Sequence, residues 1–314
     1  MKTILFVHQS ADLYGSDRVL LDLACGVQSR GMKAIVLLPT AGPLLGRLTA
    51  ANVEAHVVPV ARLTRASLSP LGLLCLPGEI RRALRAIDEL LRGRTVHLVH
   101  SNTLAVLGGA FWAKRHRLPH LWHVHELLVS PGVVRHGFPW LLRWLADRVL
   151  CNSVMTAMWV LDEQPVLGPR TDVVWNGIVP REQAGHALAS GRTFRSEVGC
   201  TASGMVCVAM VGRVNRLKGQ ALLVEAATWL WRQGVRNVVF VLVGSPPNGQ
   251  EHYLEDLRKR VADSPARARI VLRDFQEDIW PVWEGCDIAV VPSTEPESFG
   301  LVAIEAMSSG KPVV

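Results

Sequence analysis

The sequence lacks the patterns that mark a membrane or secreted protein. No uncharged run reaches the ~20 residues that a membrane-spanning helix needs. The opening residues, Met1 to His8, are too few and too soon polar for a signal peptide, and they instead indicate a first buried strand. The six cysteines are scattered without the spacing of a metal site or a disulfide framework, which favours a reducing cytoplasm. We therefore expect a globular, cytoplasmic protein.

Signatures of nucleic-acid binding are also missing, although the formal net charge is +7. There is no run of Lys and Arg interleaved with aromatic residues, no helix-turn-helix and no zinc finger. Arginines dominate the positive charge and many fall in the N-terminal half, so an anionic membrane surface or an anionic acceptor is favoured over nucleic acid as a partner. A high-GC genome that places arginine on ordinary surfaces explains the same composition equally well.

The chain does contain a regular alternation of apolar strands and amphipathic helices. Its 314 residues can form two domains of roughly 100–200 residues each. Strands that are apolar on both faces and separated by helices, such as 18–30 and 79–92, indicate parallel sheets covered on two sides. We predict such strands at 3–8, 34–38, 55–59, 96–100, 120–125 and 148–152, and again at 206–211, 237–243, 270–272 and 287–292.

This pattern predicts an α/β protein with two doubly wound, Rossmann-like domains. The first is expected over residues 1–178 and the second over 204–314, with an irregular polar linker at 179–203. Ligands are expected in the cleft outside the carboxyl ends of the strands.

The most informative stretch runs from Glu297 to Glu305. A buried strand precedes a polar loop here, and residues 299–307 have the composition of a helix. Glu297 is expected in the loop and Glu305 one to two turns inside the helix, so that both carboxylates can face one cleft. Gly300 lets a ligand approach the backbone, and the amides of the first helical turn suit a phosphate. The loop therefore fits a nucleotide-sugar, although a solvated helix start would show the same two carboxylates.

The first strand is not followed by the dinucleotide fingerprint of a dehydrogenase. The segment 7–18 has one glycine where G-x-G-x-x-G would require three. Gly15 and Ser16 instead open the next helix, with amides and a hydroxyl directed at the cleft. Ser16 fits a plain N-cap equally well.

Histidines close the strand predicted at 120–125. His123 and His125 share one face by strand alternation, and the pair His125-Glu126 lies where the strand meets the cleft. Two histidines and a glutamate without a fourth ligand are a weak metal signature. A substrate contact and a structural histidine are both compatible with His125.

Cations follow the strand predicted at 206–211, in the segment Gly212-Arg-Val-Asn-Arg-Leu-Lys-Gly219. Arg213 and Lys218, a few residues apart at a strand end, would neutralise a leaving group on which negative charge develops. Arg216 lies between them and is assigned no role.

Two stretches have the composition of helices that lie at a membrane interface. Residues 135–148 combine tryptophan with arginine, and the apolar stretch 68–77 precedes a basic helix. A core helix with an arginine fringe is the alternative for both.

These motifs resemble the retaining GT-B glycosyltransferases of family 4, the group 1 glycosyltransferases. The spacing of Glu297 and Glu305 is similar to the family's Glu-x7-Glu motif, and the segment from Gly212 to Gly219 to its Gly-Arg…Lys-Gly element. The resemblance implies two Rossmann-like domains facing a cleft, with the second domain incomplete, because family chains continue beyond Val314. We therefore expect a fragment of a longer protein or a poorly soluble chain.

The resemblance also implies roles for individual residues. Arg213 and Lys218 are expected to hold the donor diphosphate, and Glu305 to accept from the ribose hydroxyls. Glu297 is expected to accept from the sugar, and His125 to touch the sugar or position the acceptor. The further donor contacts that it implies are Gly15, Ser16, Gly244, Phe275, Ser298, Phe299, Gly300 and Leu301.

The function implied is transfer of a sugar from a nucleoside diphosphate to an acceptor hydroxyl, with retention and without a metal ion or other cofactor. The acceptor is a polysaccharide, a glycolipid or a natural product, and peripheral contact with an anionic membrane is a further expectation. A GT-B nucleotide-sugar epimerase and a truncated, non-catalytic nucleotide-binding chain remain the alternatives.

Overall fold

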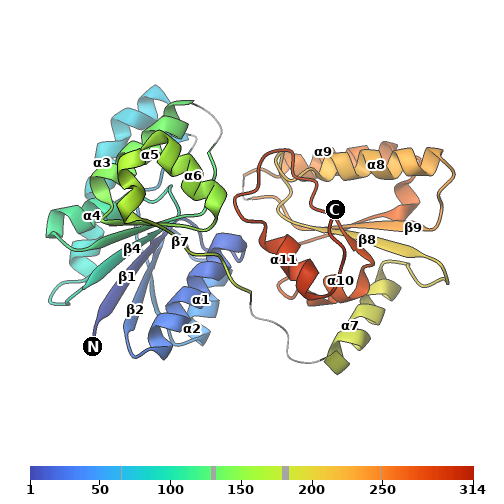
Figure 1. Cartoon of the computed structure of the whole chain (residues 1–314), viewed down its shortest axis with the longest axis horizontal. Helices are drawn as coiled ribbons and strands as arrows, with labels where there is room; N and C mark the ends of the chain where they lie inside the picture. Colours follow the sequence, from blue (N-terminus) through green and yellow to red (C-terminus); the bar gives the residue numbers. More distant parts are fainter. Residues whose placement is uncertain (65, 129–131, 179–183, 248) are drawn as a thin grey trace. The chain divides into compact units, whose positions relative to one another are not determined.

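A computed structural model of the chain describes residues 1–64, 66–128, 132–178, 184–247 and 249–314. The chain divides into two compact units, residues 1–177 and 178–314 (Figure 1). Each unit is built on one parallel sheet with helices on both of its faces.

The sheet of unit 1 has seven strands in the order β3-β2-β1-β4-β5-β6-β7. They are β1 (Thr3–His8), β2 (Lys33–Leu38), β3 (Glu54–Val57), β4 (Leu98–Asn102), β5 (His120–Val124), β6 (Arg148–Cys151) and β7 (Thr171–Val173). Leu5 and Val7 are buried on one face of β1 and Phe6 on the other, as a sheet covered on both sides requires. The order of the strands reverses between β1 and β4, which places a ligand crevice at their carboxyl ends.

Helices cover both faces of this sheet. They are α1 (Gly15–Ser29), α2 (Pro43–Ala50), α3 (Pro70–Leu90), α4 (Gly108–His116), α5 (Gly132–Leu145) and α6 (Val154–Glu163), with short 3-10 turns η1 (Ala66–Leu68) and η2 (Pro165–Arg170). Figure 1 shows α1 and α2 on one face and α3 to α6 on the other.

The sheet of unit 2 has the order β10-β9-β8-β11, and it too reverses next to its first strand. Its strands are β8 (Val206–Val211), β9 (Val238–Val243), β10 (Ile270–Arg273) and β11 (Ile288–Ala289). The strand predicted at 287–292 is thus only two residues long as β11, although the amides of Val290 and Val291 still donate to Ala209 O and Val314 O, both at 2.8 Å. Val313 forms a parallel bridge with Ala289 on the outer edge.

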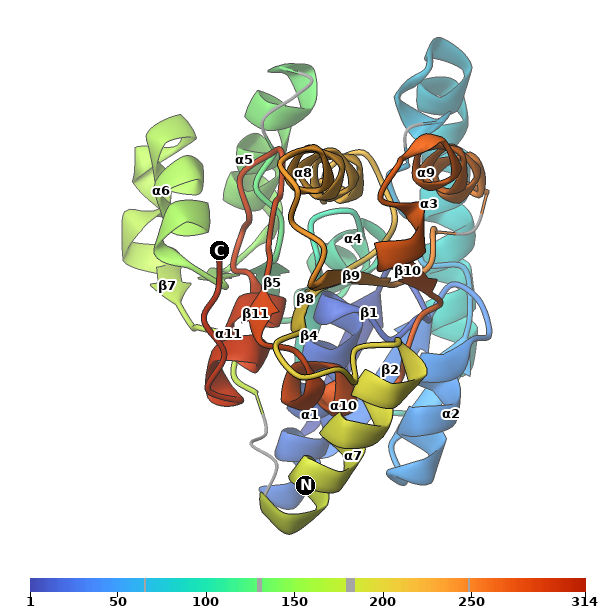
Figure 2. The same ribbon diagram turned by 90° about the vertical axis from the view of Figure 1, so that its right-hand side faces the viewer.

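The helices of unit 2 are α7 (Ala184–Glu197), α8 (Gln220–Arg232), α9 (His252–Asp263), α10 (Trp280–Gly285) and α11 (Leu301–Ser308), with a 3-10 turn η3 (Arg267–Arg269). Figure 2 shows α8 and α9 on one face of the sheet and α7 and α10 on the other. Trp283 of α10 is fully buried and packs in the core of this second layer.

The irregular linker predicted at 179–203 contains helix α7 instead, which belongs to unit 2; residues 179–183 lie outside the described residues. Phe194 of α7 is buried in the unit's core. Arg195 Nη1 donates to Gly285 O at 3.0 Å and to Asp287 Oδ2 at 2.8 Å. Contacts distant in sequence therefore stabilise α7, and its polar composition hid the helix.

The two stretches considered as interfacial or core helices are only partly buried. In α5, Phe138 and Leu142 lie in the core, whereas Trp140 and Trp144 are 49% and 64% exposed. Leu71 and Leu74, in the first turns of α3, are 72% and 79% exposed. One side of each helix therefore packs in the core, and the other side exposes large apolar side chains. Among the described helices, none is both long and apolar enough to cross a membrane.

Candidate functional site

Two glycines shape the loops at the carboxyl edge of the unit 2 sheet. Gly219 ends the loop after β8 at φ 80°, and a Cβ there would lie 1.8 Å from Pro292 O. Gly244 follows β9 at φ 147°, and a Cβ there would lie 1.9 Å from Gly212 O. Only glycine fits either position, because the chain approaches another backbone closely in a conformation that side chains disfavour. The loops after β8, β9 and β11 are therefore held together without room for side chains between them.

Lys218 and Glu297, which lie 79 residues apart, meet on two of these loops. Lys218 Nζ is 2.5 Å from Glu297 Oε1, and Ser293 Oγ donates to the same oxygen. Asn215 Oδ1 accepts from the amides of Leu217 at 3.0 Å and Lys218 at 3.1 Å, which fixes the turn that carries the lysine. Both charged side chains remain about 30% exposed, so a ligand at this edge can reach them.

The other two cations of the β8 loop are placed differently. Arg213 is half-buried, and its carbonyl accepts from Gln220 Nε2 at 2.7 Å. Arg216 is 62% exposed and forms an ion pair with Glu295. The structure thus supplies a reason, absent from the sequence, to leave Arg216 outside the candidate site.

Helix α11 begins at Leu301, two residues later than predicted, so that Ser298 and Phe299 stay in the loop. Gly300 is the N-cap residue in the left-handed region, at φ 80°. Glu305 lies in the second turn, as predicted, but it is only 7% exposed, whereas the side chain of Glu297 is 27% exposed. The two carboxylates therefore differ in environment: Glu297 is accessible and paired with a lysine, and Glu305 is buried.

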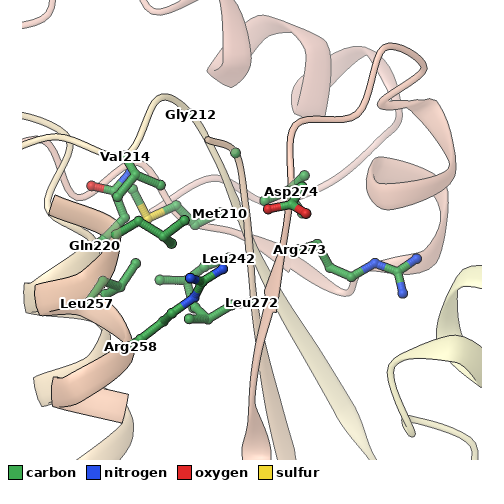
Figure 3. A pocket seen from close by; sticks show the side chains of 13 residues that line it. Met210, Gly212, Val214, Gln220, Leu242, Leu257, Arg258, Leu272, Arg273 and Asp274 are labelled. Carbon is green, nitrogen blue, oxygen red and sulfur yellow. The ribbon is translucent and has the colours of Figure 1, made fainter. Parts of the chain in front are cut away.

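A cavity of about 140 Å³ lies at the carboxyl ends of β8, β9 and β10, against α8 and α9 (Figure 3). Gly212 and Gly244 contribute from the strand ends, and Gln220 from α8. Figure 3 shows Arg258 reaching toward it from α9 and Asp274 from the end of β10. Ser245 Oγ accepts from the amide of Phe275 at 3.0 Å, which ties the β9 and β10 loops together at the carboxyl edge.

Gly15 and Ser16 begin α1 at the carboxyl edge of the unit 1 sheet, as predicted, but Tyr14 is the N-cap residue. Asp17 Oδ2 accepts from the Tyr14 amide at 2.9 Å. The N-cap role considered for Ser16 is therefore wrong. The buried Asp17 also lies 2.6 Å from His8 Nε2 at the end of β1.

His125 and Glu126 follow β5, as predicted, and their side chains have different hydrogen-bond partners. Glu126 Oε2 accepts from the amides of Leu104 and His125, both at 3.1 Å, so its carboxylate turns back onto the chain. Burial raises the pKa of Glu126, and these two hydrogen bonds oppose the rise. His125 Nε2 lies 2.9 Å from Asn102 Oδ1, at the end of β4.

His125 is one of several buried histidines in unit 1. The rings of His123 and His125 are 4.0 Å apart, which confirms that the two share a face, and His100 lies 5.5 Å from His123. Burial lowers the pKa of His123 and His120 to about 4 and those of His100 and His125 well below the usual value. Within the described parts of the chain, no group of three or more His, Cys, Asp or Glu side chains is arranged to hold a metal ion.

Comparison with known families assigns the chain. Residues 14–182 match the model of the family described as Glycosyltransferase Family 4, and residues 202–314 match that of the Glycosyl transferases group 1. The first match alone covers more than half of the 314 residues. The chain belongs to glycosyltransferase family 4.

Curated relatives of this family 4 chain include the D-inositol 3-phosphate glycosyltransferases of Nocardia farcinica and of Mycobacterium sp. (strain JLS). They are 35% identical over 173 residues and 33% identical over 177 residues. Each match covers 54% of this chain and 37% of the relative, so the chain matches little more than a third of these relatives' length.

Solved structures similar to the family 4 chain include Anabaena HepE in complex with UDP and glucose, with a TM-score of 0.81 and 24% identity over 100% of this chain and 80% of HepE. A glycosyltransferase of Rickettsia africae has a TM-score of 0.74 and 19% identity, over 99% of this chain and 78% of its own. These likenesses confirm the predicted α/β fold of the GT-B type.

Two residues at the unit 2 site of the family 4 chain were missed in the sequence. Arg258 follows the buried Leu257 on the amphipathic α9 and carries no motif, so no signal distinguishes it from a solvated cation. Ser293 lies in the polar loop after β11, and its hydroxyl donates a hydrogen bond to Glu297, four residues further on. Neither residue carries a motif that marks its role.

Proposed function

We propose that this family 4 chain takes part in moving a sugar from a nucleoside-diphosphate sugar to an acceptor hydroxyl, with retention of configuration. The observation that supports the proposal most directly is the pair of Lys218 and Glu297 on adjacent loops at the carboxyl edge of unit 2. A cation suits the diphosphate and a carboxylate suits sugar hydroxyls. At Gly300, the N-cap residue of α11, a Cβ would meet only the Ala303 Cβ at 3.9 Å, so a ligand can approach the backbone there.

In this proposal Lys218 and Arg213 stabilise the departing diphosphate without a metal ion. The bond from the anomeric carbon to the diphosphate oxygen breaks, and the acceptor oxygen bonds to the same face of that carbon. The departing phosphate oxygen takes the acceptor's proton. Glu297 orients the sugar, Glu305 accepts from the ribose, and His125 of unit 1 contacts the sugar or the acceptor.

The donor classes offer the decisive test. UDP-sugars come first, since HepE was solved with UDP and with UDP-glucose and similar chemistry is proposed here. UDP-, GDP- and ADP-sugars are incubated with the chain and a panel of sugar and glycolipid acceptors, and NMR identifies the product anomer. We expect transfer with the donor's anomeric configuration retained. Interconversion of donor sugars without an acceptor would establish an epimerase, and nucleotide binding without turnover would establish a non-catalytic chain.

We also propose that the protein is cytoplasmic and that unit 1 contacts an anionic membrane peripherally. The exposed Trp140 and Trp144 of α5, with Arg143 stacked 5.2 Å from the Trp140 ring centre, combine apolar surface with positive charge. Leu71 and Leu74 of α3 add further exposed apolar side chains.

Sedimentation with vesicles tests this contact. Binding to anionic vesicles is expected to fall as the salt concentration rises, because salt screens the attraction to arginine. The double substitution Trp140→Ala, Trp144→Ala should reduce binding at low salt, whereas Trp229→Ala, at a 60% exposed tryptophan of unit 2, should leave it unchanged. Equal sedimentation with neutral and anionic vesicles, or none at low salt, would refute the proposal.

A further inference from the structure

A buried chain of polar side chains connects the start of α1 to His125. Asp17 Oδ1 lies 2.6 Å from His8 Nε2, and His8 Nδ1 lies 3.1 Å from Asn102 Nδ2. Asn102 Oδ1 lies 2.9 Å from His125 Nε2. His8, Asp17 and Asn102 are fully buried and His125 is 8% exposed, so water does not compete for these bonds.

The partners of Asn102 determine how its amide is oriented. Its Nδ2 donates to Ser16 O at 3.2 Å and faces His8 Nδ1 at 3.1 Å. The reversed amide would place Oδ1 against the carbonyl oxygen of Ser16, where neither atom carries a proton. The side chain of Asn102 must therefore present Oδ1, an acceptor, to the ring of His125.

This orientation decides which nitrogen of His125 carries the proton. Burial lowers the pKa of His125 well below its usual value, so the ring is neutral near pH 7 and holds one proton. Because Asn102 Oδ1 can only accept, that proton lies on Nε2. In the described part of the chain, Nδ1 of His125 makes no hydrogen bond. Both ring nitrogens of His123 are fully buried without a partner, but Nδ1 of His125 is not fully buried in this way. Nδ1 is thus left as an acceptor.

We propose that Asn102 is a positioning residue that holds His125 in the Nε2–H tautomer, so that Nδ1 accepts a hydrogen bond from a substrate hydroxyl. The second half of this inference rests on the proposed function, in which His125 contacts the sugar or the acceptor. The first half concerns the protein alone, and it can be measured without turnover.

The tautomer is read from long-range proton–nitrogen correlation spectra of the whole chain labelled with ¹⁵N-histidine. The His125 signals are assigned by their loss in His125→Gln. We expect the ratio of the Nε2–H form to the Nδ1–H form to exceed that in a free neutral histidine by about tenfold, the scale of one net hydrogen bond, and to fall back to that ratio in Asn102→Ala. Asn102→Asp keeps an acceptor at this position, so it should keep the tautomer, and its carboxylate should raise the pKa of His125.

Asn152→Ala is the matched control. Asn152 is also buried at a strand end and donates to His125 O at 3.4 Å, but among the described residues the ring's hydrogen bond is to Asn102 and not to Asn152. It should leave the tautomer unchanged. A dominant Nδ1–H form in the unmodified chain, or an unchanged tautomer in Asn102→Ala, would overturn the positioning role. If Asn102→Ala does not fold, the unmodified chain and Asn102→Asp still decide.

Turnover tests the second half. Once a donor and acceptor are known, Asn102→Ala should lower kcat about 10- to 100-fold with little change in the KM for the donor, because a misdirected contact weakens the transition state. If Asn102→Ala loses the Nε2–H preference of His125 but keeps its kcat, His125 has no part in the reaction. Asn102 would then still determine which nitrogen of His125 carries the proton. Absence of any transfer by the unmodified chain would refute the proposed function and leave the tautomer result standing.

Discussion

Glu297→Gln is expected to lower turnover about 100-fold or more while the affinity for nucleoside diphosphate is retained. The substitution keeps the shape of the side chain and an oxygen for Ser293, but it removes the charge that Lys218 Nζ contacts at 2.5 Å. The loss of a preorganised charge at a reacting centre is on the scale of 10²–10³ in kcat. Affinity for the diphosphate should hold or rise, because Lys218 no longer divides its interaction between Glu297 and the phosphate.

Lys218→Ala should weaken nucleotide binding, which Glu297→Gln should not. It removes a cation from the diphosphate, and binding of UDP should weaken by about 1.5–3 kcal/mol, the scale of hydrogen bonds to charged groups. Arg216→Ala is the control, since Arg216 belongs to the same loop but is exposed and paired with Glu295. Calorimetric titration with UDP and steady-state kinetics separate the two effects. Equal loss of UDP affinity in Glu297→Gln and Lys218→Ala would mean that the pair only stabilises the loops.

Most strands of the two sheets could be predicted from the sequence. Strands β1, β2, β5, β6, β8, β9 and β10 lie within about a residue of their predicted ranges, because a strand buried on both faces is a continuous apolar run. The edge strand β7 was missed, since its three residues are only partly buried and leave no such run. Helix α7 was missed because Phe194 and Arg195 act through partners nearly a hundred residues away.

The contacts within the candidate site could not be predicted in the same way. The segment expected as a strand at 96–100 forms a strand two residues later, as β4, and only this shift places Asn102 opposite His8 in the sheet. The pairs of Lys218 with Glu297 and of Asn102 with His125 join residues on separate loops. Motifs identified the loops, and the register and loop geometry determined which atoms meet.

Unit 1 is expected to lose stability steeply as the pH falls from about 6.5 toward about 4. His120 and His123 are buried, and burial lowers the pKa of each to about 4 from an unfolded value of 6.5. The unfolded chain therefore binds these protons more tightly than the folded chain. Their contribution is fully present above about pH 6.5, and its loss near pH 4 amounts to about 3 kcal/mol for each histidine.

Other groups at this edge modify the loss. His100 and His125 have lowered pKa values for the same reason and add to it. Glu126 acts in the opposite direction, because burial raises its pKa and favours the protonated, folded form as the pH falls. Four buried histidines lose stability as the pH falls and one buried carboxyl gains it, so the net effect of acid on unit 1 should be destabilising.

The substitution His123→Phe isolates the effect. Both ring nitrogens of His123 are buried without a hydrogen-bond partner among the described residues, and the ring packs against His125 at 4.0 Å. Phenylalanine keeps the aromatic contact and cannot be protonated. It should stabilise the fold by about 1–3 kcal/mol near pH 7, where it removes an unsatisfied polar group, and by more near pH 4. His252→Phe, at an exposed histidine on α9, is the matched control and should change neither value.

Hydrogen exchange measured by mass spectrometry between about pH 7 and pH 4, corrected for intrinsic exchange rates, can follow the two units separately. Protection of β1, β4 and β5 should fall with pH, whereas β8 and β9, whose strands contain no histidine, should keep theirs over more of the range. In His123→Phe the unit 1 strands should remain protected to lower pH. Parallel loss of protection in both units, or an unchanged pH dependence in His123→Phe, would show that groups other than the buried histidines set the acid limit of this fold.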